Sequence, residues 1–365
     1  MRVTGIKLRQ FRSYEALDLK TEPGLVVLTG QNGTGKTNIL EALFLCALGK
    51  SHRTNRDGDL IRIGSNAELV ELTLDTLGGS RVIRTELKEA ERKKITIDAR
   101  PLARSGELMG CLNVVMFSPE DLSLVKGSPA ERRRFLDMEI SQLKPAYYYA
   151  LQQYNNALKQ RNNLLKDEDA ASNEMLELWD EQLSKHGALI MQERAAFCRE
   201  LKEKAGTLHR RMSGGKELLV TDYAPDVYVK PGGDCREAIA ESLINALDKD
   251  LFRGYTSAGP HRDDISLTVN GLDARIYASQ GQQRTAALSL KLSEIAVTER
   301  LRGEKPVLLL DDVFSELDSE RQRLLLGAAE GCQCFITCTG LEELGPMENS
   351  SMQLFGVKNG QVWEL

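Results

Sequence analysis

The segment from Gly30 to Thr37 combines the residue types that bind the phosphate chain of a nucleotide. Its sequence, GQNGTGKT, fits the pattern G-x-x-x-x-G-K-[ST] at every position. Glycines let backbone N–H groups wrap the phosphates, Lys36 carries the cation expected to bridge the β- and γ-phosphates, and the Thr37 hydroxyl is a ligand for Mg²⁺. We therefore expect the whole loop to bind ATP: Gly30, Gln31, Asn32, Gly33, Thr34, Gly35, Lys36 and Thr37.

Two carboxylates stand near the other end of the chain. Asp311 and Asp312 directly follow residues 307–310, an apolar run with the pattern of a buried strand. Asp311 is expected to hold Mg²⁺ through water, and Asp312 to orient or deprotonate the attacking water. With Lys36, these two residues are the predicted catalytic groups.

The elements around the loop and the carboxylates predict how both are positioned. Residues 25–28 form an apolar strand pattern before the loop, and a helical pattern begins at Asn38. Strands are also predicted in the first 120 residues by period-two patterns. These lie at residues 3–11, 14–19, 68–75, 81–87 and 112–117.

A helical stretch separates the two halves. From Pro145 to Met212 there is no further proline, and apolar residues recur every seven positions from Leu176 to Phe197. We expect two antiparallel helices joined by a turn at 167–173 and ended by Ser213. Strands and helices then return, with a helix at 236–251, a hairpin turn at Asn270-Gly271 between strands 265–269 and 272–277, and a helix at 281–300. The expected architecture is α/β, one head built from residues 1–144 and 213–365 with an inserted helical arm at 145–212.

Composition sets the class of protein. The chain has 365 residues, 41% apolar and 28% charged, and no apolar stretch of the ~18 residues that cross a bilayer. Seven cysteines spread over this length argue against a disulfide framework and favour the reducing cytoplasm, without membrane attachment. The net charge of −5 means that any nucleic-acid site must be a local basic surface.

A third motif precedes the carboxylates by about thirty residues. It runs Ser279-Gln280-Gly281-Gln282-Gln283 and resembles the signature of ATP-binding-cassette (ABC) ATPases. Its chemistry requires a helix amino terminus and a serine hydroxyl that face a γ-phosphate. In ABC ATPases the signature completes the site of a second subunit, so Ser279, Gln280, Gly281 and Gln282 are expected to act in trans.

Blocks along the whole chain resemble the RecF family of bacterial DNA replication and repair proteins, which belong with the SMC-like ABC-type ATPases but carry a short helical arm. Besides the motifs above, the blocks are FRSY at 11–14, SHR at 51–53, FSPEDL at 117–122, GSP at 127–129, RRRFLD at 132–137, GPHRDD at 259–264 and DDVFSELD at 311–318. The resemblance implies the fold of an ABC-type (SMC-like) P-loop ATPase head, and it adds Arg12 to the ATP-binding residues.

The resemblance also implies an activity and partners. Members of this family are expected to form an ATP-dependent homodimer, to hydrolyse ATP slowly with Mg²⁺, and to bind single-stranded, gapped or duplex DNA. They are expected to help RecO and RecR load RecA during recombinational repair and SOS induction. DNA contacts are predicted, in order of preference, at Arg53 and Arg56 with Lys50, and then at the run Arg132, Arg133 and Arg134 and at Arg210 and Arg211; His261 and Arg262 lie in a turn that is either structural or functional.

Other readings remain open from the sequence. An ATPase subunit of an ABC-type transporter, another SMC-like chromosome protein, a P-loop kinase and a scaffold without hydrolysis are the alternatives. Ser118-Pro119-Glu120 stands where a transporter normally has glutamine, and Cys338-Thr339 where a switch histidine is common. Thr337 and Thr339 are the alternative γ-phosphate sensors.

Overall fold

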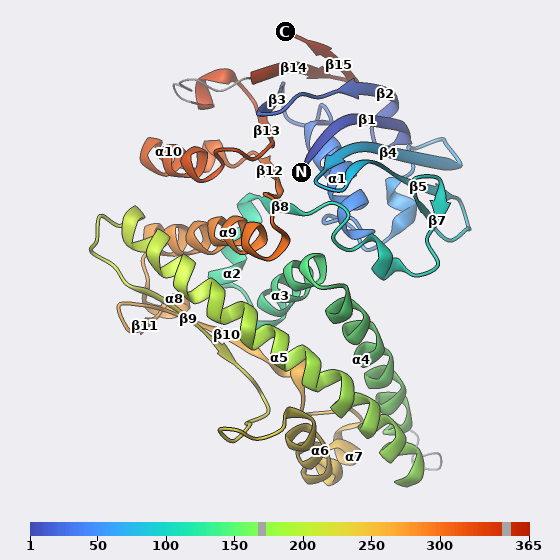
Figure 1. The fold of residues 1–365 in the computed structure, drawn as a ribbon, viewed down its shortest axis with the longest axis vertical. Coiled ribbons are helices and arrows are strands. Elements are labelled where there is room, and N and C mark those ends of the chain that lie inside the picture. The colour runs from blue at the N-terminus through green and yellow to red at the C-terminus, as the bar shows by residue number, and fades with distance from the viewer. Residues whose placement is uncertain (167–172, 345–351) are drawn as a thin grey trace. The chain divides into compact units, whose positions relative to one another are not determined.

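The computed structural model describes residues 1–166, 173–344 and 352–365 (Figure 1). The chain divides into two compact units. The head unit consists of Met1–Asp121 and Leu290–Leu365, and the arm unit of Leu122–Ser289. Both chain ends therefore build the unit that contains the phosphate loop and the two carboxylates.

The first sheet of the head unit is antiparallel, with the order β2-β1-β4-β5-β6-β7. Its alternating pattern places one apolar face inward, as the period-two sequence predicted. The strands are β1 (Arg2–Phe11), β2 (Tyr14–Lys20), β4 (Ala67–Thr76), β5 (Gly79–Lys88), β6 (Lys94–Ile97) and β7 (Arg100–Pro101).

The second sheet of the head unit has the order β15-β14-β3-β13-β12-β8 and is parallel except for β15 at its edge. Four of its strands are buried along nearly their whole length, so they are continuous apolar runs rather than alternating ones. They are β3 (Leu25–Thr29), β8 (Val114–Phe117), β12 (Val307–Asp311) and β13 (Cys334–Cys338). The other two, β14 (Met352–Lys358) and β15 (Gln361–Glu364), carry exposed residues.

Helix α1 (Lys36–Leu48) lies between these two sheets and contacts strands of both (Figure 1). Residues 39–48 are all buried, which explains why this helix is apolar on every side. Short elements complete the head unit: η1 (Asp57–Leu60), η2 (Ser105–Leu108), η5 (Phe314–Glu316), α10 (Ser319–Ala328) and η6 (Leu341–Leu344).

The arm unit combines helices with a three-stranded sheet of order β11-β10-β9. Its helices are α2 (Ser123–Lys126), α3 (Pro129–Leu143), α4 (Pro145–Leu164), α5 (Asn173–Met212), α6 (Cys235–Asn245), α7 (Leu247–Arg253) and α8 (Ala274–Tyr277), with the turn η4 (Pro260–Arg262) and the start of α9 (Gln280–Arg302). Its strands are β9 (Leu219–Ala224), β10 (Asp264–Val269) and β11 (Leu272–Asp273).

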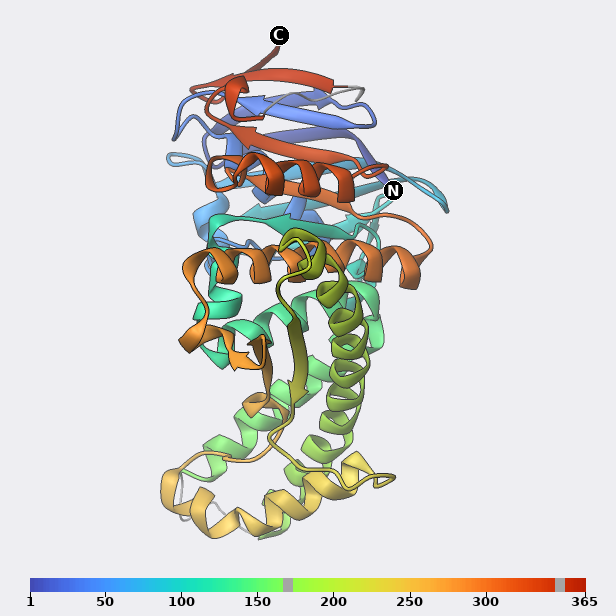
Figure 2. The ribbon, with the colours of Figure 1, turned by 90° about the vertical axis from the view of Figure 1, so that its left-hand side faces the viewer.

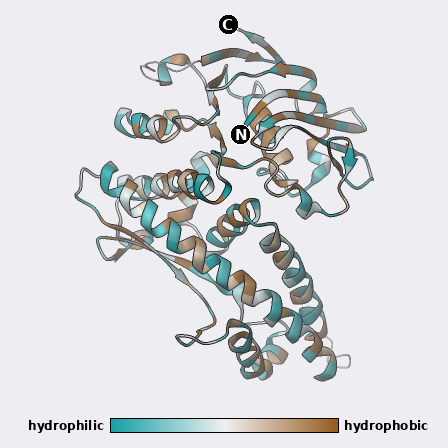
Figure 3. Ribbon diagram, viewed as in Figure 1, coloured by the Kyte–Doolittle hydropathy of each residue, from teal (hydrophilic) through white to brown (hydrophobic). Residues whose placement is uncertain are grey.

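The two long helices expected from the sequence are α4 and α5, which pack side by side. Both carry alternating hydrophilic and hydrophobic bands in Figure 3, as helices with one apolar face should. The compact unit is larger than the expected arm at 145–212, because β9 runs along α5 (Figure 2) and α3 also contacts both helices. The turn predicted at 167–173 lies almost entirely outside the described residues.

Two local expectations after the arm helices were wrong. The single helix predicted at 236–251 is interrupted between α6 and α7. The strand predicted at 272–277 ends after β11, because the Asp273 side chain accepts the N–H groups of Arg275 and Ile276 and starts the short helix α8. The hairpin turn itself is confirmed, with φ of 52° at Asn270 and 80° at Gly271.

Candidate nucleotide-binding site

The phosphate loop connects β3 to α1, which confirms the expected strand–loop–helix arrangement. Gly30, Gly33 and Gly35 have φ of 155°, 80° and 112°. A Cβ at Gly30 would lie 2.3 Å from the carbonyl oxygen of Val357, and a Cβ at Gly35 would lie 2.6 Å from Ser13 Oγ. Both positions therefore require glycine for packing, as well as for the left-handed φ at Gly35.

The side chain of Lys36 folds back over the loop. Its Nζ donates to the carbonyl oxygens of Gly30 at 2.5 Å and Gln31 at 3.0 Å. The residue is only 5% exposed. The ammonium group is thus held above the loop where a phosphate chain would lie, and among the described residues its hydrogen-bond partners are these two carbonyl oxygens.

Thr37 and Asp311 meet directly, although 274 residues separate them in the chain. The Thr37 hydroxyl donates to Asp311 Oδ1 at 2.9 Å, and the Thr337 hydroxyl donates to the same oxygen at 2.9 Å. Strand β13 lies between β3 and β12, so the carboxyl ends of all three strands share one edge of the sheet. A hydroxyl beside a carboxylate is a set of oxygen ligands that suits Mg²⁺.

Asp312 follows β12 in a left-handed conformation with φ of 55°. Its backbone N–H donates to Thr337 Oγ1 at 2.9 Å. The oxygen Oδ1 is buried and has no hydrogen-bond partner among the described residues. Burial raises the pKa of Asp312, and the nearby Asp311 and Glu343 add to this shift while Lys36 opposes it.

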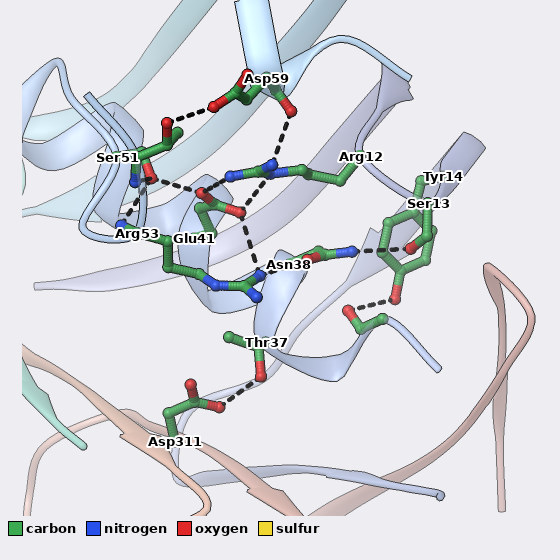
Figure 4. Close-up of polar contacts among 12 residues, drawn as sticks. Arg12, Ser13, Tyr14, Thr37, Asn38, Glu41, Ser51, Arg53, Asp59 and Asp311 are labelled. Atoms are coloured by element: carbon green, nitrogen blue, oxygen red, sulfur yellow. Dashed lines mark hydrogen bonds and ion pairs between the residues drawn. The ribbon is translucent and has the colours of Figure 1, made fainter. Parts of the chain in front are cut away.

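A buried carboxylate, Glu41, organises the region beyond the loop (Figure 4). Arg12 holds both oxygens of Glu41, through Nη2 at 2.6 Å and Nε at 2.8 Å. Ser51 donates to Oε1 at 2.5 Å, and Arg53 Nη1 lies 3.8 Å from Oε2. Two guanidinium groups thus surround one carboxylate, which leaves a net charge of about +1 one helical turn after Thr37.

Sequence reasoning missed this arrangement, although a signal was present. Glu41 stands in an apolar helix, and a buried carboxylate requires a charged partner. Arg12, predicted to bind ATP, has its guanidinium on Glu41 and on the carbonyl oxygen of Asp59. Tyr14 from the same block donates to the carbonyl oxygen of Gly35 at 3.1 Å and thereby supports the end of the loop.

The signature motif of the arm unit begins α9. The backbone N–H of Ser279 donates to Gln282 Oε1 at 2.8 Å, and the N–H of Gln282 donates to Ser279 Oγ at 3.3 Å. This reciprocal pair is a capping box, which fixes the helix start. Ser279, Gln280 and Gly281 are exposed, so the amino terminus of α9 faces solvent in the single chain.

The basic residues predicted to contact DNA differ in their surroundings. Lys50, Arg53 and Arg56 are exposed. Arg132 is 6% exposed and forms a bidentate ion pair with Asp264 at 2.6 and 2.9 Å. The guanidinium of Arg132 is thus occupied inside the arm unit, and DNA contact by Arg132 stays a prediction.

The other arginines predicted to contact DNA, Arg133 and Arg134 of the basic run and Arg210 and Arg211 of the second group, also differ in their exposure. Arg133 is half-buried and donates to the carbonyl oxygen of Asp263 at 2.7 Å. Arg134, Arg210 and Arg211 are exposed.

The GPHRDD block lies partly in the core of the arm unit: Gly259, Pro260 and Asp263 are buried, whereas Arg262 is exposed. Arg194 donates to Asp263 Oδ2 at 2.9 Å and to the carbonyl oxygen of Pro260 at 2.6 Å, and Tyr223 also donates to Asp263. His261 Nδ1 lies 2.7 Å from the Tyr154 hydroxyl, and burial lowers the pKa of this histidine. Of the two readings of His261, these contacts favour the structural one.

The chain is similar over its whole length to curated RecF proteins. It is 41% identical to the DNA replication and repair protein RecF of Clostridium acetobutylicum, covering 100% of both chains. It is 43% identical to that of Alkaliphilus oremlandii, covering 99% of this chain and 100% of the relative. The chain belongs to the RecF family. The RecF/RecN/SMC N terminal domain family matches residues 2–361.

Solved structures agree with this family membership. A structure of the recombination mediator protein RecF with ATP, described as part of the RecFOR pathway, matches with a TM-score of 0.92 and 35% identity, covering 100% of this chain and 97% of that chain. An SMC head bound to the C-winged helix domain of ScpA matches with a TM-score of 0.57 and 16% identity, covering 100% of this chain and 98% of that chain, which shows the fold alone. The predicted fold, an ABC-type SMC-like ATPase head, is confirmed. Within the described ranges, no helix is long and apolar enough to span a bilayer.

Proposed function

We propose that this protein is an ATP-switched DNA-binding protein of DNA replication and recombinational repair. ATP with Mg²⁺ binds the head unit, two copies then close over the nucleotide, and slow hydrolysis reopens the dimer. In the cytoplasm, the dimer binds single-stranded, gapped or duplex DNA. It works with RecO and RecR to load RecA, and so contributes to SOS induction.

One observation carries this proposal. Thr37 of the phosphate loop and Asp311 of β12 form a 2.9 Å hydrogen bond at the shared edge of the parallel sheet. The relatives named RecF, including one solved with ATP, share this chain's whole length.

The described residues fit ATP and Mg²⁺. Thr37 and Asp311 would hold the metal, which neutralises charge on the β- and γ-phosphates. The loop supplies inward N–H groups and Lys36 a cation. The unpartnered Oδ1 of Asp312 is a proton acceptor for the water that attacks the γ-phosphate, and Asp312 is the residue we assign to water activation.

The exposed end of α9 supports the dimer. The segment that leads to Ser279 carries three exposed apolar side chains, Leu272, Ile276 and Tyr277, which are 57%, 68% and 66% exposed. Burying this exposed apolar surface against a second copy of the chain would be favourable, and the amino terminus of α9 would then face the partner's phosphates.

The proposed function is tested by measuring how tightly the protein binds gapped duplex DNA with and without ATP. Fluorescence anisotropy should show tight binding only with ATP and Mg²⁺, and binding should weaken steeply with salt, because phosphate contacts release counterions. Binding that ignores ATP would contradict the switch.

Arg53 and Arg210 provide a comparison within this assay. Arg53→Ala should weaken ATP-dependent DNA binding, since its side chain is 48% exposed and contacts α1, the helix that follows the loop. Arg210→Ala, which removes an exposed arginine from the end of α5, tests the second predicted basic group in the same assay. A larger loss in Arg210→Ala would move the DNA surface to the arm unit.

A further inference from the structure

The structure separates the two threonines that the sequence left open as γ-phosphate sensors. Thr337 is 1% exposed, donates to Asp311 and accepts the N–H of Asp312. The single hydroxyl proton of Thr337 is therefore donated to Asp311, the carboxylate that we propose as a ligand of Mg²⁺. Thr339 is exposed and stands in the bend directly after β13, where a ligand can reach it.

Thr339 lies beside the first residue of the phosphate loop. In the register of β13 and β3, Cys338 pairs with Thr29, which makes Gly30 the next neighbour on the loop side. The N–H of Gly30 donates to the carbonyl oxygen of Cys338 at 3.3 Å. The hydroxyl of Thr339 is thus attached by a short, hydrogen-bonded backbone to the loop that carries Lys36.

The partner of Thr339 is a carboxylate that the motifs did not single out. Its hydroxyl donates to Glu343 Oε1, while Glu343 Oε2 is buried and has no hydrogen-bond partner among the described residues. The backbone of Glu343 is anchored, since its carbonyl oxygen accepts from Gln322 Nε2 at 3.1 Å. The same Gln322 amide also donates to the carbonyl oxygens of Phe314 and Leu317 in the segment after Asp312.

We propose that Thr339 and Glu343 form the γ-phosphate sensor of this site. A threonine hydroxyl has one proton, so it cannot donate to Glu343 and to a phosphate oxygen at the same time. With ATP, the hydroxyl turns from Glu343 to the γ-phosphate; with ADP it stays on Glu343. Thr339 is the residue that touches the nucleotide, and Glu343 is a positioning residue that competes for its proton.

This inference rests on the proposed function, and it predicts opposite effects at the two positions. Thr339→Val removes the donor and should lower ATP affinity about tenfold while leaving ADP affinity unchanged, because hydrogen bonds to charged groups are the strong ones. Thr339→Ser should restore ATP affinity. Glu343→Gln replaces a charged acceptor by a weaker neutral one and removes a negative charge near the phosphate, so it should raise ATP affinity relative to ADP.

Isothermal titration calorimetry of the full chain with ATP and with ADP, both with Mg²⁺, measures the two affinities. Their ratio, ATP affinity to ADP affinity, is the quantity compared between variants. Glu342→Gln is the matched control, since it removes an exposed charge one residue away and should keep the wild-type ratio. Equal losses for both nucleotides in Thr339→Val would indicate a structural role and overturn the proposal. An unchanged or lowered ratio in Glu343→Gln would also overturn it. Wild-type protein that binds neither nucleotide would instead refute the proposed function.

Discussion

Lys36 illustrates how much of the phosphate chemistry depends on a single side chain. Its ammonium group rests on two loop carbonyl oxygens, at 2.5 and 3.0 Å, and a bound phosphate chain would replace these neutral partners by charged ones. Lys36→Ala should therefore abolish measurable ATP binding and ATP-stimulated DNA binding. Nucleotide titration checks this, with the exposed Lys20→Ala as control. Undiminished ATP affinity in Lys36→Ala would remove the loop from the proposed function.

Asp312 should matter after ATP is bound. Asp312→Asn keeps the size of the side chain, and asparagine tolerates the left-handed φ of 55° well, so the variant should fold and bind ATP normally. Turnover should fall about 100-fold or more, the range that a positioned general base contributes. Steady-state phosphate release measures it.

The pH profile adds a second check on Asp312. The base acts when deprotonated, and burial raises its pKa, so wild-type turnover should be lost as the pH falls from neutral through that raised pKa. Asp312→Asn should lack this decline. Wild-type turnover in the variant would move water activation to another residue.

At the scale of single elements, β4 carries a carboxylate that the nucleotide chemistry does not use. Glu68 is 3% exposed, and neither of its oxygens has a partner among the described residues. Burial raises the pKa of Glu68 from 4.5 to about 8, Lys93 opposes this shift, and Asp57 and Glu86 add to it. The folded protein thus holds a proton at neutral pH that the unfolded chain has lost.

Glu68→Gln should therefore make the protein more stable at pH 8. Between pH 4.5 and 8, unfolding releases the proton of Glu68. As the pH rises through this range, Glu68 should therefore lower the wild-type free energy of unfolding by up to about 1.4 kcal/mol per pH unit. The variant should lose that slope and match the wild type near pH 4.5. Urea denaturation from pH 5 to 8 measures it, with the exposed Glu89→Gln as control. A slope retained in Glu68→Gln would assign the titration to a different group.

The elements that sequence patterns predicted are those with strong local signals. The phosphate loop lies between β3 and α1 as its glycines and flanking apolar runs predicted. Contacts distant in sequence were not predictable in this way. The burial of Arg132 depends on its ion pair with Asp264, 132 residues away.

The residues that pack with the arm helices extend beyond the expected arm at 145–212. Heptad spacing identified α5, but spacing within one helix does not show what covers that helix. The structure packs β9 on α5 and ties Arg194 of α5 to Asp263, so residues well beyond 145–212 fold with the helices. Part of the GPHRDD block, which the sequence presented as a motif, packs against these helices in the core of the arm unit.

At the scale of the whole molecule, the chemistry is divided between the two units. The loop, Asp311 and Asp312 belong to the head unit, whereas Ser279 belongs to the arm unit. The proposed function requires Ser279 of one copy to contact the γ-phosphate held by another copy. Dimerisation should then depend on ATP and increase as the nucleotide concentration exceeds its dissociation constant.

Ser279→Arg tests that requirement. The exposed serine caps α9, and a long cationic side chain in its place would both remove the hydroxyl and occupy the space of the partner's phosphate. We expect the variant to retain ATP affinity, because Lys36 is untouched, and to lose both the ATP-induced dimer and hydrolysis. Ser279→Ala separates the two effects: it removes the hydroxyl without adding bulk and should weaken the dimer less.

Sedimentation velocity with and without ATP decides the outcome. The wild type should sediment as a 40.6 kDa monomer without nucleotide and as a dimer with ATP and Mg²⁺. Phe252→Arg, which places the same charge on a 91% exposed side chain of α7, is the matched control and should dimerise like the wild type. A Ser279→Arg protein that still dimerises with ATP would exclude the signature from the interface. A wild type that remains monomeric with ATP would refute the two-copy mechanism, and the phosphate loop would then serve a single subunit.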